Sequence, residues 1–137
     1  IEPHSFYFKT VRPIQILDLS FNNISDLENN VFHVIKFYIN FNQLIYFENS
    51  SVITGYEFET SLASNNLKEF PPFFYKNKII MKSIDLSQNN IEILNNIDNN
   101  DTHYDQSIRL FYFILKKNNL KIIENLAFKK IIYKKKN

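Results

Sequence analysis

One pattern recurs five times along the chain, and this repetition constrains the fold more than any other feature of the sequence. Each copy centres on an asparagine, and consecutive asparagines are separated by 20, 23, 24 and 29 residues. Apolar residues stand three and five positions before the asparagine and two and five positions after it, with Thr60 as the single departure. Because apolar residues make up only 45% of the chain, chance does not produce so regular a pattern. The repeated asparagines are Asn22, Asn42, Asn65, Asn89 and Asn118.

The spacing within each copy predicts a short strand followed by a turn. In the first copy, Leu17 and Leu19 alternate as the side chains on one face of a strand do, and the turn follows at Asn22. Asparagine suits this turn because its side-chain amide can donate hydrogen bonds to backbone carbonyls. Ile24 and Leu27 then return beneath the strand. Stacked copies therefore predict a parallel sheet and a ladder of the five asparagine side chains that ties successive turns together.

These copies resemble the leucine-rich repeat, whose consensus is L-x-x-L-x-L-x-x-N-x-L, over residues 14–123. The resemblance implies an α/β repeat fold, a right-handed solenoid arc of about five repeats. Its parallel β-sheet would lie on the concave face and its convex side would be irregular or 3-10. The chain is then a single leucine-rich-repeat domain over residues 1–137. Residues 1–13 form an N-terminal flank or cap and the Lys-rich residues 124–137 a C-terminal flank, unless both are the ends of a longer array.

The third copy is the weakest, because Glu57 and Thr60 replace apolar residues there. Either its strand is shifted or Phe58 fills the vacancy. Phe21 and Phe41 directly precede the asparagine in two consecutive copies. We expect them to cover the turn, with an exposed ledge as the alternative.

The segments outside the strands are predicted to be irregular. The spacing of 29 residues before Asn118 indicates an insertion, for which residues 95–107 are the candidate. Pro71 and Pro72 exclude a helix that continues past Phe70.

The side chains between the buried strand positions point to solvent. The resemblance implies that they form a ligand surface on the concave face. Tyr38, Tyr112, Ile16 and Ile114 are the most informative, because apolar and aromatic anchors dominate binding energy. The alternative is that the aromatic rings only stack on their neighbours. The predicted partner-binding residues are Ile16, Asp18, Lys36, Tyr38, Asn40, Ser61, Ser83, Asp85, Tyr112, Ile114 and Lys116, within a wider set that adds Ser20, Glu59, Ala63 and Ser87.

The composition excludes several kinds of chemistry. The absence of Cys excludes disulfide frameworks, Cys-based zinc sites and thiol nucleophiles, and a single Gly excludes Gly-rich phosphate loops. The three histidines fit no metal-binding pattern, and DTHYD at residues 101–105 is interpreted as a solvated loop rather than a cation clasp. Asp18 and Asp85 stand three copies apart, which is ~15 Å and too far for paired-carboxylate catalysis. We therefore expect no catalytic residue, no metal and no cofactor.

The charge is unevenly distributed although the net charge is only +2. Residues 109–137 contain nine basic residues and one acidic residue, whereas residues 1–108 contain seven basic and thirteen acidic residues. A solvated Lys-rich end is favoured over a nucleic-acid or membrane contact, because no recognition motif accompanies the lysines. No stretch reaches the roughly 18 apolar residues of a membrane span.

The leading functional hypothesis is a non-catalytic protein–protein interaction scaffold that binds a protein partner through its concave face. The alternative is a ligand-sensing ectodomain fragment of a Toll-like or other leucine-rich-repeat receptor, because LDLSFNNISDLENNVF at residues 17–32 resembles such ectodomains. Glycosylation sequons occur at Asn23, Asn49 and Asn100, a number close to chance. The absence of Cys favours a cytoplasmic or nuclear protein over an extracellular one.

Overall fold

The computed structural model describes residues 14–27, 31–47, 51–53, 58–71, 81–95, 110–124 and 127. No residue in these ranges lies in an α-helix or a 3-10 helix. The chain forms the strands β1 (Ile14–Asp18), β2 (Val31–Tyr38), β3 (Ser51–Ile53), β4 (Phe58–Ser61), β5 (Met81–Asp85), β6 (Ile93–Leu94), β7 (Leu110–Ile114) and β8 (Ile122–Ile123).

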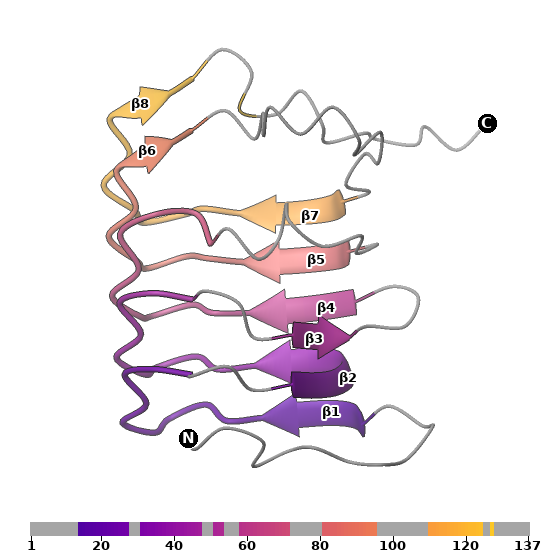
Figure 1. The fold of residues 1–137 in the computed structure, drawn as a ribbon. Helices are drawn as coiled ribbons and strands as arrows, with labels where there is room; N and C mark the ends of the chain where they lie inside the picture. The colour runs from indigo at the N-terminus through magenta and orange to yellow at the C-terminus, as the bar shows by residue number, and fades with distance from the viewer. Residues whose placement is uncertain are drawn as a thin grey trace, which may run out of the picture.

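Five of these strands form one parallel sheet in the order in which they occur along the chain, β1-β2-β4-β5-β7 (Figure 1). Strand β3 pairs with the first residues of β2, outside this order. On the return side, β6 and β8 form a second parallel pair, and Glu69 bridges to Ile93. The predicted parallel sheet is confirmed.

The expected α/β class includes helices, but the described residues contain none. The return segments there are extended because their backbone groups bond to neighbouring segments rather than within one turn of chain. Gln43 N donates to Ile24 O at 2.9 Å and Asn66 N donates to Leu44 O at 2.8 Å. These bonds take the place of the local bonds that a helix would need.

The register of the sheet aligns the repeated positions of the sequence. The residues five positions before each asparagine are paired across the strands, from Leu17 to Phe37, Thr60, Ile84 and Phe113. Side chains alternate between the two faces of a strand, so all the side chains of one aligned column lie on the same face of the sheet. The apolar columns therefore meet on one side of the sheet.

The core lies between this side of the sheet and the return segments. Phe37, Ile39, Leu62, Ile84 and Leu86 are completely buried beneath the central strands. Each such side chain contributes about 1.5–3 kcal/mol of hydrophobic free energy relative to an exposed one. The equivalent residues of β1, and those of the turns beside β1 and β7, are only partly buried. Each copy is covered by its neighbours, and in the described residues these two end copies have a neighbour on one side only. Those packed at the margin of the core are Ile14, Leu17, Leu19, Ile24, Phe70, Phe113, Leu115 and Leu120.

The third copy keeps its register at Thr60, and Phe58 fills the vacancy. Thr60 is buried, and its hydroxyl donates to the Phe37 carbonyl at 2.9 Å, so the polar atom has a partner. The register shifts between Phe58 and Glu59, which pairs Phe58 with Met81. Phe58 thereby enters the column that Glu57 would have occupied and is buried.

The residue before each of the five asparagines has a left-handed backbone conformation, with φ between 51° and 58°. Non-glycine residues pay about 1–2 kcal/mol for this conformation. The left-handed conformation persists because hydrogen bonds hold the backbone on both sides of it. The strand makes those before the turn, and the asparagine side chain makes those after it. The five residues are Phe21, Phe41, Ser64, Gln88 and Lys117.

Several sequence predictions lie outside the described residues. These are the flank at residues 1–13, most of the insertion at residues 95–107, Pro72, and residues 125–137 apart from Ala127. His4, His103 and the sequons at Asn49 and Asn100 fall in the same category.

Candidate binding face of the sheet

The sheet presents a face of aligned side chains on the side opposite the core, which we call the outer face. Lys36 and Tyr38 are half-buried here, while Phe37 and Ile39 beside them are buried on the core side. The register pairs the outer residues into rows across the strands. The outer face consists of the row Ile16, Lys36, Glu59, Ser83 and Tyr112, the row Asp18, Tyr38, Ser61, Asp85 and Ile114, and the adjoining turn positions Ser20, Asn40, Ala63, Ser87 and Lys116.

A charged cluster occupies the middle of the outer face. The Glu59 carboxylate lies 2.7 Å from Lys82 Nζ and 3.0 Å from Lys36 Nζ. The Tyr38 hydroxyl donates to the same carboxylate at 3.5 Å. The hydrogen bond from Lys82, followed by that from Lys36, lowers the pKa of Glu59 below its ordinary value. The cluster is therefore a fixed carboxylate between two ammonium groups at neutral pH.

Lys82 was not predicted for this face. The same register shift that buries Phe58 also sets Lys82 between Met81 and Ser83, which pair with the consecutive residues Phe58 and Glu59 of β4. Lys82 is thus an extra residue in β5 relative to β4, and its ammonium group lies beside Glu59. The only sequence signal was the missing apolar residue at Glu57, which indicates that something in the third copy is irregular.

Two of the predicted acidic residues hold their own turns. Asp18 Oδ1 accepts the backbone N–H of Ser20 at 2.9 Å, and Asp85 Oδ1 accepts that of Ser87 at 2.8 Å. Hydrogen bonds from Ser20 lower the pKa of Asp18. Each carboxylate thereby stabilises the turn that follows its own strand.

Asn40 has a largely internal role. Its Oδ1 accepts hydrogen bonds from the Ser61 hydroxyl and from Ala63 N, the latter at 3.0 Å. Asn40 N in turn donates to Ser20 Oγ at 3.1 Å. These bonds join three neighbouring turns into a polar network. Asn40 therefore stabilises the margin of the outer face at which the strands end in turns.

Apolar side chains stand at both ends of the outer face. Tyr112 exposes 65% of its surface, and Ile114 exposes 40% on the same strand, β7. Ile16 exposes 57% on β1. The exposed Lys116 follows Ile114. The structure thus brings an aromatic ring, an aliphatic side chain and a cation together at the β7 end.

The asparagines lie at the turns and link each copy to the one before it. The side-chain amide of Asn42 donates to Leu19 O at 2.9 Å, and its Oδ1 accepts Ile24 N at 2.9 Å. Asn65, Asn89 and Asn118 make the corresponding bonds. Asn22 is exposed and, among the described residues, donates only to Leu19 O and Ser20 O of its own copy.

Phe21 and Phe41 form an exposed ledge, so the expectation that they cover the turn was wrong. Their rings stack with centroids 4.4 Å apart, and Phe21 exposes 76% of its surface. Their left-handed backbone conformation directs both side chains away from the core.

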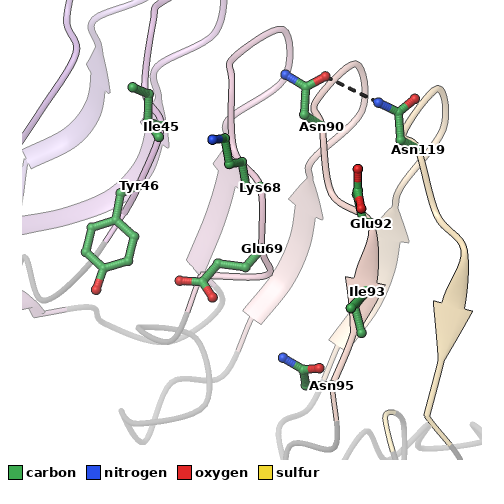
Figure 2. A pocket seen from close by; sticks show the side chains of 9 residues that line it. All are labelled: Ile45, Tyr46, Lys68, Glu69, Asn90, Glu92, Ile93, Asn95 and Asn119. Atoms are coloured by element: carbon green, nitrogen blue, oxygen red, sulfur yellow. Dashed lines mark hydrogen bonds between the residues drawn. The ribbon is translucent and has the colours of Figure 1, made fainter.

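A groove of about 780 Å³ crosses the return segments (Figure 2). The repeat pattern does not predict this groove, although the lining residues stand mostly one, three and four positions after the repeated asparagine. Figure 2 shows the side chains of Asn90 and Asn119 joined by a hydrogen bond at one margin of this groove. Glu92 at the groove pairs with Lys121 at 3.0 Å. The lining residues are Ile45, Tyr46, Lys68, Glu69, Asn90, Glu92, Ile93, Asn95 and Asn119.

In the described ranges, no three His, Cys, Asp or Glu side chains gather closely enough to hold a metal ion. The part of the chain that the structure describes also contains no helix with the length and apolar character needed to cross a membrane.

In comparisons with known proteins, no family model matched the chain, and neither a curated protein nor a solved structure showed significant similarity to it.

Proposed function

We propose that the chain is a leucine-rich-repeat solenoid of about five coils whose outer face is the concave side and binds a protein partner. The recurring sequence pattern, the in-register parallel sheet and the asparagine bonds between successive turns all support this architecture. A right-handed arc follows from the same resemblance, with the groove on its convex side.

The observation that carries the proposal is the exposed Tyr112 and Ile114 beside a charged surface. Aromatic and aliphatic side chains that are open to solvent provide binding energy when a partner covers them. The Glu59 cluster and the carboxylates of Asp18 and Asp85 provide charges that select the partner and its orientation. This combination is typical of a protein interface, in which a few apolar anchors are surrounded by polar groups.

The test compares variants of the full chain in crosslinking capture from source-cell lysate, followed by titration of each captured protein in purified form. The variant Tyr38→Ala/Tyr112→Ala/Ile114→Ala removes three side chains of the outer face. The control Ile45→Ala/Ile93→Ala removes exposed side chains on the return side. We expect the first variant to bind a captured protein at least about tenfold more weakly, because anchor residues contribute about 1–2 kcal/mol or more each. We expect the control to bind as the wild type does.

Equal affinity of the wild type and the triple variant would overturn the proposal. Loss of binding in the control alone would assign the interaction to the return side instead.

A second candidate, the receptor ectodomain fragment, is favoured by the position of Asn23. This sequon residue is exposed at a turn, and its Oδ1 accepts the Gln43 side chain. Its amide nitrogen has no partner in the described residues, and that atom is where a glycan attaches. Secretion from eukaryotic cells tests this candidate: it predicts a glycan mass that Asn23→Gln reduces, and an unmodified Asn23 would contradict it.

A further inference from the structure

The same hydrogen bonds recur at each joint between neighbouring strands. At the joint between β2 and β4, Ile39 N donates to Ser61 O at 2.9 Å and Phe41 N donates to Ala63 O at 3.0 Å. The Asn65 side chain completes the joint, because its Oδ1 accepts Leu44 N. Equivalent bonds join β1 to β2, β4 to β5, and β5 to β7.

The two ends of the sheet contain the two halves of one such joint. At the β7 end, the N–H groups of Leu115, Lys117 and Leu120 occupy the donor positions and have no partner among the described residues. At the β1 end, Asn22 Oδ1 occupies the acceptor position and receives no hydrogen bond in the same ranges. The matching carbonyls are those of Asp18 and Ser20. The donors of one end therefore correspond in position to the acceptors of the other.

The side chains at the two ends are also complementary. The β7 end presents Lys116 and Lys117, while the β1 end presents Asp18. In the register of the internal joints, Tyr112 would lie against Ile16, two apolar side chains that are both largely exposed. Lys117 would lie against the ring of Phe21 in the way that Phe21 lies against Phe41 within the chain. A cation over an exposed aromatic face is attractive.

We propose that a second copy of this chain docks its β1 edge onto the β7 edge of the first and continues the parallel sheet from one molecule to the next. The joint is head-to-tail, so each added copy exposes a new edge, and the assembly grows with concentration rather than stopping at a dimer. The joint uses Ile16, Asp18, Tyr112 and Lys116, which lie at the two ends of the outer face, and it needs no other molecule.

The experiment measures the mass of the purified full chain by sedimentation velocity over a wide range of concentration. We expect the weight-average mass to rise progressively above the 16.4 kDa of one chain. It should fall when salt is added, because exposed charges take part in the joint. A mass that stays at 16.4 kDa at every concentration would overturn the proposal, as would a mass that stops at twice this value.

Charge exchange tests the geometry of the joint. The variant Lys116→Glu/Lys117→Glu makes the β7 end acidic, and Asp18→Lys/Phe21→Lys makes the β1 end basic. All four side chains are exposed, and the left-handed position of Phe21 accepts lysine, since Lys117 has the same conformation. We expect each variant alone to remain a single chain, because its own two ends now repel, and we expect an equimolar mixture to regain assembly.

Ile45→Lys is the matched control, since it adds a charge at an exposed position away from both edges. It should assemble as the wild type does. Assembly of either charge variant alone, or a mixture that stays as single chains, would contradict the head-to-tail joint. None of these results depends on a protein partner, so they leave the proposed function to its own test.

Discussion

Asn65 Oδ1 accepts a hydrogen bond from the backbone N–H of Leu44 at 3.0 Å, 21 residues earlier in the chain. Asn65 Nδ2 donates to the carbonyl of Ile39, which lies beside the preceding turn. A single buried amide thus satisfies a donor and an acceptor that no strand ladder reaches. Its removal would leave the Leu44 N–H buried without its acceptor, which costs about 1–3 kcal/mol. The Ile39 carbonyl would lose one of its two side-chain donors and keep the bond from Asn42 Nδ2 at 3.3 Å.

Asn65→Ala should therefore lower the free energy of unfolding by about 2–3 kcal/mol. Asn22→Ala removes the same side chain from an exposed turn, where it bonds only within its own copy, and should cost less than about 1 kcal/mol. Urea denaturation followed by circular dichroism measures both values. Similar losses for the two variants would show that the ladder does not stabilise the stack.

Ser64 combines two unfavourable features that glycine would remove. Its φ is 56°, and its hydroxyl is buried with no hydrogen-bond partner in the described residues. Ser64→Gly should raise the free energy of unfolding by about 1 kcal/mol, after about 0.5–1 kcal/mol is lost to the greater freedom of glycine in the unfolded chain.

Gln88→Gly provides the comparison, because Gln88 has nearly the same φ but an exposed side chain. Thermal denaturation should show a smaller stabilisation for Gln88→Gly than for Ser64→Gly. The reverse order would mean that the buried hydroxyl carries no cost.

Phe58 is the residue that restores the core of the third copy. Phe58→Ala should lower the free energy of unfolding by about 3–5 kcal/mol, because it removes a buried ring. The strand register holds the surrounding backbone in place, so the cavity that the ring leaves stays open. Phe21→Ala deletes an exposed ring and should cost less than about 1 kcal/mol. Denaturant unfolding of the two variants distinguishes these roles, and equal effects would contradict the placement of Phe58 in the core.

The Glu59 cluster should make stability depend on pH in the acid range. The pKa of Glu59 is lowered from 4.5 by Lys82 and Lys36, so its contribution is fully present above pH 4.5 and is lost as the pH falls through the lower, folded-state pKa. At neutral pH, Glu59→Gln should lower the free energy of unfolding by up to about 1 kcal/mol. The difference from the wild type should shrink as the medium becomes more acidic. A difference that is the same across this range would mean that the ion pairs contribute nothing.

The parallel sheet and its aligned columns could be predicted because the repeat fixes which residues face each other. The Leu17 column and the asparagine turns follow directly from spacing. The left-handed turn residues could not be predicted, because such positions are usually marked by glycine, and this chain has Phe, Ser, Gln or Lys there. The sequence pattern without that conformation places Phe21 and Phe41 over the turn rather than in the exposed stack that they form.

The outer-face rows were predictable for the same reason, since alternation along a strand assigns them. The charged cluster was not, because Lys82 reaches Glu59 only through a register shift at Phe58. The groove on the return side was also missed. Its residues come from segments whose arrangement depends on bonds between copies, such as the bridge from Glu69 to Ile93, and not on a pattern within one copy.

Hydroxyl-radical footprinting of the chain, free and with a captured protein partner bound, shows which face of the sheet the partner covers. It measures how accessible individual side chains are to solvent. We predict that Tyr38, Tyr112 and Ile16 become protected when the partner binds, while the exposed Ile45 and Ile93 react as before. Protection of Ile45 and Ile93 with no change at Tyr112 would contradict the account and place the partner on the return side.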